Sequence, residues 1–315
     1  MAARPTTNPP RVEHVSRLSP GHVAMVIELV EAATEADGVR PLSEHVLLHL
    51  RHGGEEATRN VLLYHGEKLA AFGHLDVADK VAGPSAEVVV HPERRRSGYG
   101  RRLVQELMSA APQGRLRLWA HGEHPAAAAL AASMGFSRSR ILWQMRRSLN
   151  AALPEPVVPD DVDVRTFQPG RDDRRWVALN RAVFAEHPEQ GRWALDDLRV
   201  RMNESWFDPA GFFLAERAGR LVGFHWTKVH GASSDHGSDH AHQRIGEVYV
   251  VGVEASEHGK GLGRALTLVG LRHLRQRGLA DAMLYVEADH EPAVRLYTSL
   301  GFTRWENDVM FGRER

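Results

Sequence analysis

Residues 246–266 read GEVYVVGVEASEHGKGLGRAL, and the two halves of this stretch predict different secondary structure. The first half is rich in β-branched and aromatic residues and predicts a buried strand. The second half places Gly259, Gly261 and Gly263 within five positions, and apolar residues at helical spacing follow them. A strand, a glycine turn and a helix can cradle a phosphate, because glycine lets the backbone approach the ligand and helix amides point at it. Glycines also make ordinary strand-to-helix corners, so the turn alone leaves both interpretations open.

The same pattern occurs a second time in the chain. Residues 87–104 read EVVVHPERRRSGYGRRLV, again a strand followed by spaced glycines and an apolar helix. The glycines of 98–100 precede those of 261–263 by 163 positions, and the MGF of 134–136 precedes the LGF of 300–302 by 166. Self-similarity at a nearly constant offset indicates two copies of one module.

Composition restricts the possible functions. The chain has 315 residues, a formal net charge of zero and no cysteine. The absence of cysteine excludes disulfides, thiolate nucleophiles and cysteine-ligated metals, and the neutral charge argues against nucleic acid or an anionic membrane as partner. No run approaches 18 apolar residues, and residues 1–10 lack the apolar core of a signal peptide. We therefore expect a monomeric, soluble, cytoplasmic protein.

The periodicity predicts an α/β (α+β) fold with two domains, each a mixed sheet flanked by helices. We expect an N-terminal domain at 1–149, a linker with three prolines at 150–161 and a C-terminal domain at 162–315. Residues 1–11 are expected to be disordered. Besides the helices after the two glycine turns, helices are expected at 21–36, 43–50, 125–133, 172–185, 194–203 and 292–300. Strands are expected at 60–65, 68–77, 116–120, 139–147, 162–167, 247–253, 282–288 and 303–312, with a further hairpin at 211–229.

These motifs resemble a known family. The Arg-x-x-Gly-x-Gly pattern of Arg95–Gly100, directly after a strand, resembles the pyrophosphate loop of the GCN5-related N-acetyltransferases. Residues 293–302 (AVRLYTSLGF) resemble that family's last helix and the turn after it. The duplication and the segments 187–191 (HPEQG) and 223–230 (GFHWTKVH) are similar to a tandem branch of the family. The resemblance implies two tandem acetyltransferase domains that use acetyl-CoA as co-substrate and no metal.

The resemblance also implies the acceptor, the cysteinyl amine of cysteinyl-glucosaminyl-inositol. Two alternatives stay open: N-acetylation of another small amine or a protein N-terminus, and a regulatory protein that binds CoA without catalysis. The neutral surface and the two segments above favour the first interpretation.

Transfer of an acetyl group to an amine needs a proton acceptor, donors for the tetrahedral oxyanion and a proton for the leaving thiolate. Backbone amides around Val251–Val253 are the expected oxyanion donors. Glu247, which strict alternation places on the same strand face as Tyr249, Val251 and Val253, is positioned as the base. Tyr297, one turn before Gly301, is positioned as the acid. A strand-edge carboxylate and a core tyrosine are the structural alternatives, and the family resemblance favours the catalytic roles.

The duplication predicts different roles for the two copies. At the 163 offset the counterpart of Glu247 is Pro84, and at the 166 offset the counterpart of Tyr297 is Ala131. The N-terminal copy keeps the phosphate loop without the two proton-transfer residues. We therefore expect it to bind CoA without catalysing the reaction, and the C-terminal copy to be the enzyme.

The resemblance implies the remaining site residues. Those expected at CoA are Val88, Val89, Val90, Arg96, Ser97, Gly98, Tyr99, Gly100 and Arg101 in the first copy and Val251, Gly252, Val253, His258, Gly259, Lys260, Gly261, Leu262, Gly263, Arg264, His290, Glu291, Pro292, Ala293, Val294 and Arg295 in the second. Those expected at the acceptor are Glu44, Glu189, Lys228, Glu247 and Tyr285. Because Glu44 belongs to the first copy, the acceptor is expected between the domains, although Glu44 could also be a solvated residue at a helix start.

Two of the residues expected at CoA depart from the family pattern: His258 stands where Arg or Gln is usual, and His290 stands where Asn is common. Both keep hydrogen-bonding capacity, so the departures concern affinity. The segment 230–242 carries four histidines among Gly, Ser and Asp, and it predicts a flexible loop rather than a metal site because the spacing matches no ligand motif.

Overall fold

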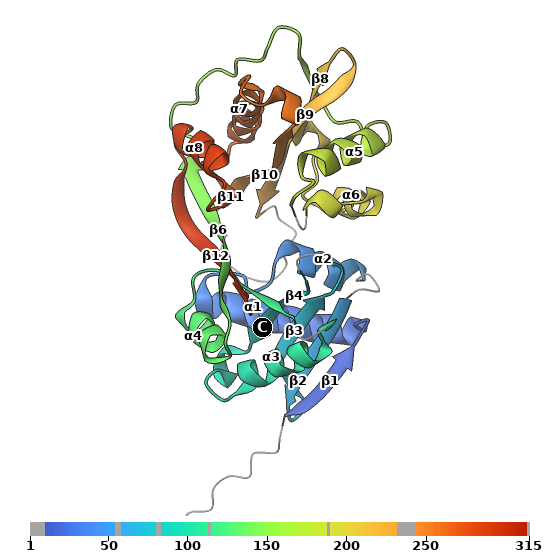
Figure 1. Cartoon of the computed structure of the whole chain (residues 1–315), viewed down its shortest axis with the longest axis vertical. Coiled ribbons are helices and arrows are strands. Elements are labelled where there is room, and N and C mark those ends of the chain that lie inside the picture. The colour runs from blue at the N-terminus through green and yellow to red at the C-terminus, as the bar shows by residue number, and fades with distance from the viewer. Residues whose placement is uncertain are drawn as a thin grey trace, which may run out of the picture. The chain divides into compact units, whose positions relative to one another are not determined.

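The computed structural model describes residues 10–53, 58–79, 83–112, 115–187, 190–231 and 244–313. Two compact units divide the chain. Unit 1 comprises the residues up to Ile141 together with those from Asn307 onward, and unit 2 comprises Leu142–Glu306 (Figure 1).

Unit 1 is a mixed sheet with helices on both faces. Its strands follow the order β1-β2-β3-β4-β5-β12, and only the β4–β5 neighbours run parallel. The strands are β1 (Arg11–Val15), β2 (Thr58–His65), β3 (Lys68–Asp76), β4 (Ser85–Val90), β5 (Arg117–Ala120) and part of β12 (Thr303–Gly312). Helices α1 (Pro20–Asp37) and α2 (Glu44–His52) share one core cluster with the sheet. Helices α3 (Tyr99–Ala110) and α4 (Pro125–Ser133) share the other.

Alternation along the strands explains these two layers. In β2, Leu62 joins the cluster of α1 and α2, whereas its neighbours Val61 and Leu63 join the cluster of α3. Successive side chains of a strand point to opposite faces, so a strand with apolar residues in both registers is buried on both sides. β2 has that pattern, with Val61–Tyr64 all buried.

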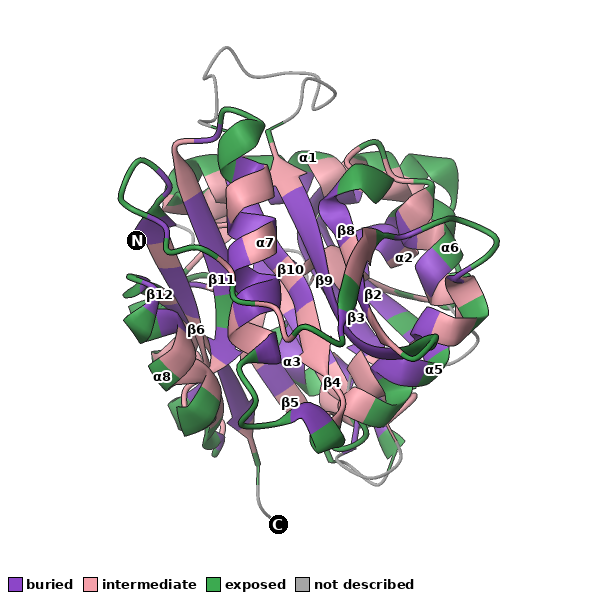
Figure 2. Cartoon of the chain, turned by 90° about the horizontal axis from the view of Figure 1, so that it is seen from above, coloured by how far each residue is buried: buried purple, intermediate pink, exposed green. Residues whose placement is uncertain are grey.

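Unit 2 repeats this architecture, with strand order β6-β11-β10-β9-β8-β7. The strands are β6 (Ser137–Ser148), β7 (Asp163–Thr166), β8 (Phe212–Arg217), β9 (Arg220–His230), β10 (Ile245–Val253) and β11 (Asp281–Glu287). Helices α5 (Asp173–Val183) and α6 (Leu195–Met202) cover one face, where Trp176 and Trp226 are fully buried. Helices α7 (Leu262–Gln276) and α8 (Glu291–Ser299) cover the other, and Figure 2 shows buried residues along α7 and the strands beside it. Short 3₁₀ turns at Pro92–Arg94, Gln190–Arg192, Pro209–Gly211 and Ala255–Glu257 complete the elements.

Each sequence repeat ends in a strand that pairs with a strand of the other repeat. The end of β12, Val309–Gly312, pairs with β5 inside unit 1, and Leu142–Ser148 of β6 pairs with β11 inside unit 2. We expected 303–312 to close the C-terminal domain. Strands of 12 and 10 residues are long enough to serve both units, which is why the compact units are not the repeats 1–149 and 162–315.

The other predicted elements agree with the structure to within a few residues. The expected disorder of 1–11 overlaps β1, which begins at Arg11, and residues 1–9 lie outside the described ranges. The segment 150–161 contains no helix or strand.

A buried charge cluster joins three parts of unit 1. His121 Nδ1 lies 2.9 Å from Asp308 of β12, and His121 Nε2 lies 3.5 Å from Glu87 of β4. Glu87 also accepts a 2.6 Å hydrogen bond from the backbone N–H of Ser43, the N-cap of α2. Burial alone would lower the pKa of His121, but the two carboxylates outweigh it and raise the pKa to about 10. The cluster therefore links β4, β12 and α2 through a protonated imidazole.

This cluster predicts a pH-dependent stability. Because the pKa of His121 is raised in the folded state, its contribution is complete below the unfolded pKa of about 6.5 and disappears as pH rises toward 10. Thermal unfolding of the wild type and of His121→Gln, followed from pH 6 to pH 10, should show a difference in Tm that is largest at pH 6 and shrinks toward pH 10. A difference that does not change with pH would contradict the assignment.

Candidate active site

The glycine turn of unit 2 forms the predicted cradle. β10 leads through the turn Ala255–Glu257 to Gly261, which caps α7 in the left-handed conformation at φ 85°. Gly259 has φ 77°, and an added Cβ at either glycine would meet no atom within 4 Å, so only their backbone conformation requires glycine. The first N–H groups of α7 have no partner within the helix, and the helix dipole adds positive potential there. The turn is thus suited to bind an anionic group such as a pyrophosphate.

Unit 1 has the same turn before α3. Gly98 caps this helix at φ 87°. Arg95 pairs with Asp37 in α1 through two contacts of 2.7 Å, so its guanidinium holds the turn against α1. Arg96, one of the residues expected at CoA, has φ 61°, a strained conformation for a residue other than glycine. Arg101 donates to Ser133, as Arg264 donates to Ser299 in unit 2, so both copies tie the cradle helix to the next helix in the same way.

Strand β10 separates from β11 at the site. The parallel pairing contains only Gly246 with Ala282 and Glu247 with Met283, although β10 continues to Val253. In unit 1, β4 pairs with β5 from Ser85 to Glu87 and continues to Val90. In each unit the predicted residues 88–90 or 251–253 therefore lie on the part of the strand that has left its parallel neighbour. Backbone amides on such an edge can donate to a ligand or an oxyanion.

A β-bulge at Tyr249 corrects the predicted strand faces. Val248 pairs with Thr227 and Val250 with Trp226, so Tyr249 is an extra residue on β10. Tyr249 and Val250 contact the cluster under α5 and α6. We expected Glu247 to share a face with Val251 and Val253, but these two valines pack against α7. Strict alternation fails because the bulge shifts the register by one residue.

The bulge also changes the counterpart of Glu247. Ser85 pairs with Arg117 as Glu247 pairs with Met283, and Arg117 and Met283 are 166 positions apart. The structural counterpart is therefore Ser85 and not Pro84. Ser85 is no carboxylate either, so the first copy still has no base at this position.

Glu247 is a buried carboxylate with a histidine partner. It is 6% exposed, and His230 Nε2 lies 2.7 Å from its Oε2. Burial raises the pKa of Glu247, but the hydrogen bond and charge of His230 and the charge of Lys228 outweigh burial and hold that pKa below its usual range. Glu247 is thus ionised at neutral pH and can accept a proton. His230 ends the segment GFHWTKVH and is one of the four histidines of 230–242, and nothing in the local sequence predicts its contact with Glu247.

Lys228 lies opposite Glu247 in the β9–β10 pairing and contacts aromatic rings. Its Nζ is 4.6 Å from the ring centre of Trp206 and 5.3 Å from that of Tyr249. The Tyr249 hydroxyl accepts a 2.9 Å hydrogen bond from Arg201 Nε, and Arg201 stacks on Trp193 at 3.8 Å. The bulged tyrosine is therefore anchored to α6, and it helps to position the ammonium group of Lys228 beside the site.

Tyr297 lies on the opposite face of the sheet from Glu247. It belongs to α8 and to the cluster under α7, with Phe302 5.9 Å away in an edge-on contact. Burial raises the pKa of Tyr297 to about 12, so the phenol keeps its proton at neutral pH. Its hydroxyl makes no hydrogen bond to any described residue. Its counterpart Ala131 is likewise buried in unit 1, in α4.

The remaining predicted residues occupy different places. His258 and His290 are exposed, the latter as N-cap of α8. Tyr285 on β11 is 40% exposed and accepts a hydrogen bond from Gln144. Glu44 is the first residue of α2 in unit 1. Glu189 lies outside the described residues, as do three of the four histidines of 230–242.

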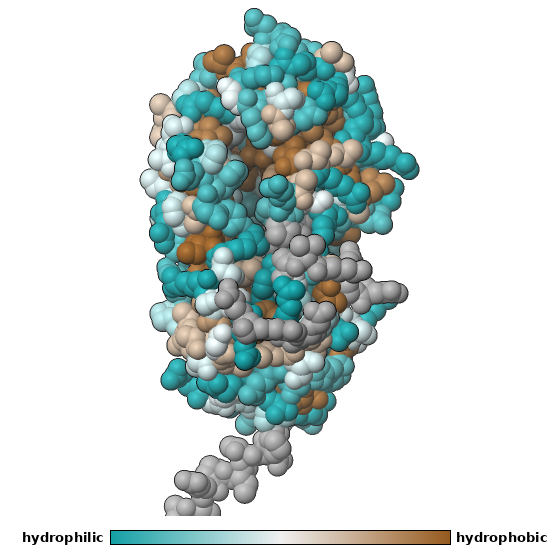
Figure 3. All heavy atoms as spheres, in the orientation of Figure 1, coloured by the Kyte–Doolittle hydropathy of each residue, from teal (hydrophilic) through white to brown (hydrophobic). Residues whose placement is uncertain are grey.

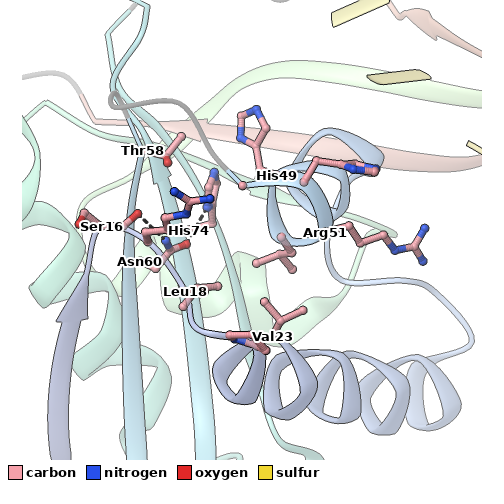
Figure 4. Close-up of a pocket in the computed structure, with 13 residues that line it drawn as sticks. Ser16, Leu18, Val23, His49, Arg51, Thr58, Asn60 and His74 are labelled. Carbon is pink, nitrogen blue, oxygen red and sulfur yellow. Dashed lines mark hydrogen bonds between the residues drawn. The ribbon is translucent and has the colours of Figure 1, made fainter. Parts of the chain in front are cut away.

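The structure also contains a pocket away from these residues. It has a volume of about 440 Å³ and lies in unit 1 between the β1–α1 turn, the end of α2 and strands β2 and β3 (Figure 4). His49, Asn60 and His74 line it, and Asn60 Oδ1 accepts a 2.9 Å hydrogen bond from His74 Nδ1. None of the predicted site residues lines this pocket.

The residues that the structure describes contain no group of three or more His, Asp or Glu side chains arranged to hold a metal ion. Among their helices, none combines the length and hydrophobicity needed to cross a bilayer.

Comparison with known families and sequences gives consistent matches. Residues 176–302 match the model of the acetyltransferase (GNAT) family, and residues 57–138 match that of the acetyltransferase (GNAT) domain. The mycothiol acetyltransferase of Acidothermus cellulolyticus is 56% identical over 310 residues, with 96% of this chain and 94% of that protein covered. Those of Streptosporangium roseum and Thermobispora bispora are 54% and 57% identical, and cover 96% and 94% of this chain and 98% of each relative.

Solved structures show the same fold. A tandem GNAT protein from the clavulanic acid biosynthesis pathway superposes with a TM-score of 0.70 at 20% identity, covering 96% of this chain and 98% of its own. A GCN5-related N-acetyltransferase from Sphaerobacter thermophilus superposes with a TM-score of 0.65 at 24% identity, covering 96% and 95%.

Proposed function

Since this chain belongs to the mycothiol acetyltransferases and contains two GNAT domains, we propose that it acetylates the cysteinyl amine of cysteinyl-glucosaminyl-inositol, the last step of mycothiol biosynthesis. It is an acetyl-CoA-dependent acetyltransferase. The choice of acceptor rests on the relatives that match nearly the whole chain, because all of them are named mycothiol acetyltransferase. The geometry of unit 2 supports a direct transfer, with the acceptor near Glu247 and the thioester near the cradle of α7.

The proposed chemistry uses both faces of the sheet where β10 leaves β11. Glu247, supported by His230, accepts the proton of the attacking amine directly or through one water. Amides of Val251–Val253 stabilise the oxyanion that forms when the amine nitrogen bonds to the acetyl carbon. Tyr297 donates its proton to the sulfur as the carbon–sulfur bond breaks, and the elevated pKa keeps that proton available. Attack and departure thus occur on opposite sides of the acetyl carbon.

Unit 1 has a different role in this proposal. Its cradle is built like that of unit 2 and can hold CoA, but Ser85 and Ala131 occupy the positions of the base and the acid. Unit 1 includes the residues from Asn307 onward, and Leu142–Ser148 belong to the sheet of unit 2, so a cut between the sequence repeats would remove a strand from each unit. The different roles of the two units are therefore best tested by substitutions in the full chain.

The acceptor assignment is tested by turnover with acetyl-CoA and a set of amines. Cysteinyl-glucosaminyl-inositol should give the highest kcat/KM, well above glucosamine, an amino acid amide and a short peptide. A comparable kcat/KM for one of the other amines would replace the acceptor, and CoA binding without any turnover would favour a regulatory protein.

The first catalytic prediction concerns Tyr297. Tyr297→Phe should retain the Tm and the acetyl-CoA affinity, because the ring stays in its core cluster. It should lower kcat by about 10²–10⁴, the usual contribution of a general acid. Unchanged turnover would make Tyr297 a packing residue.

The second concerns Glu247. Glu247→Gln should reduce activity most below neutral pH, where the acceptor amine is mainly protonated and requires a proton acceptor. The deficit should shrink as pH rises past the pKa of the amine, about 8. A pH–rate profile parallel to that of the wild type would argue against the base role.

The third concerns Glu44. If it binds the acceptor, Glu44→Ala should raise the acceptor KM about ten- to a hundredfold, the effect of losing one charged hydrogen bond, and leave the acetyl-CoA KM unchanged. Glu28→Ala, an exposed carboxylate of α1, is the matched control. An unaltered acceptor KM would leave Glu44 a solvated residue at a helix start.

A further inference from the structure

One face of the unit 2 sheet carries a row of side chains that begins at Glu247. Met283 is the cross-strand partner of Glu247 and therefore shares its face, and Tyr285 follows two positions later on the same face. Tyr285 pairs with Gln144 of β6, and Met283 pairs with Arg146. The intervening Leu284 and Met145 belong to the core cluster on the other face. The row thus runs across β10, β11 and β6, which lie side by side in Figure 1.

Side-chain contacts connect this row to an exposed tryptophan. Gln144 donates to the Tyr285 hydroxyl at 2.9 Å, and Arg146 Nε donates to Gln144 Oε1 at 2.8 Å. The guanidinium of Arg146 lies 4.4 Å from the ring centre of Trp305 on β12. Tyr285 and Trp305 are 40% and 63% exposed, and they are two of the three large hydrophobic residues exposed in the described part of the chain. Exposed hydrophobic patches that are rimmed by polar residues mark interaction sites or ligand-binding grooves, and Gln144 and Arg146 contact these two rings.

We propose that Trp305 and Arg146 form a subsite for the ring portion of the acceptor, with Gln144 as a residue that positions Tyr285. This inference rests on the proposed function. Figure 3 shows hydrophobic residues gathered around a hollow on the visible face of unit 2, among hydrophilic ones. An indole face packs against the C–H face of a six-membered ring, and a guanidinium donates to its hydroxyls.

The available donors fit a ligand rich in hydroxyl groups. Arg146 forms no ion pair with any described residue, and only its Nε is used by Gln144, so its terminal N–H groups can donate to a ligand. Stacking on Trp305 restricts the orientation of the guanidinium, which lowers the entropic cost of binding.

The length of the row fits the acceptor. Neighbouring strands are about 4.8 Å apart, so the three steps from β10 through β11 and β6 to β12 cover about 14 Å. A cysteinyl group followed by two six-membered rings spans a comparable distance, with its amine at Glu247 and its last ring at Trp305.

The test compares two acceptors that share the amine. Cysteinyl-glucosaminyl-inositol has both rings, and L-cysteinamide has none. Trp305→Ala should raise the KM for the first about tenfold or more, while kcat/KM for cysteinamide and the KM for acetyl-CoA stay unchanged. Trp305→Phe should restore most of the affinity, and Arg146→Met should behave like Trp305→Ala.

Arg304→Ala is the matched control, because Arg304 is the neighbouring residue on β12 and lies over Trp143, 5.3 Å from its ring centre. It should leave both acceptors unaffected. An unchanged KM for the two-ring acceptor in Trp305→Ala, or equal losses for both acceptors, would overturn the subsite while leaving the proposed function intact. A wild-type enzyme that does not distinguish the two acceptors, or acetylates neither, would instead remove the proposed function and the subsite with it.

Discussion

The separation of β10 from β11 is the constraint on which the rest of the site depends. Two residue pairs hold the strands together, and beyond Glu247 the edge of β10 has no parallel partner, which is where we propose that the thioester binds. The sheet can tolerate this gap because the antiparallel pairing with β9 continues to Val253 and the core of α7 supports the other face. The two proposed proton-transfer residues lie on opposite faces of the sheet beside this gap.

The bulge at Tyr249 distinguishes unit 2, the proposed catalytic copy, from unit 1. β3 and β4 pair without a shift, whereas β10 carries one extra residue that is anchored by Arg201 and packed between aromatic rings. That residue places Glu247 in the register of Ser85 and brings Lys228 beside it. In unit 1 the corresponding face has the buried cluster of Glu87 and His121, whose charges are already satisfied within the unit. The two copies therefore share a scaffold and a cradle but differ in the polar groups at the gap.

Much of this could be predicted from the sequence, because the glycine turns and apolar periodicity are local signals and the second copy repeats them. Glu247 and Tyr297 were found through the repeat and the family resemblance. The local sequence does not reveal the bulge, because Val248–Val251 all have high strand propensity. The alternation of side chains between the two faces can therefore be continued through Tyr249 without any sign of an extra residue. The exchange of β6 and β12 and the contact of His230 with Glu247 depend on pairing between distant segments, which no local pattern encodes.

We propose that unit 2 alone performs the acetyl transfer, through groups on both faces of the sheet beside the gap. Turnover of acetyl-CoA and cysteinyl-glucosaminyl-inositol by the full chain carrying both Glu247→Gln and Tyr297→Phe tests it most directly, with the cradle and residues of unit 1 left intact. We expect kcat to fall at least as far as in the more damaged single variant, since the effects of groups that act on one transition state are not additive. A double variant that keeps kcat within about tenfold of the wild type, less than the loss of one general acid or base, would contradict it.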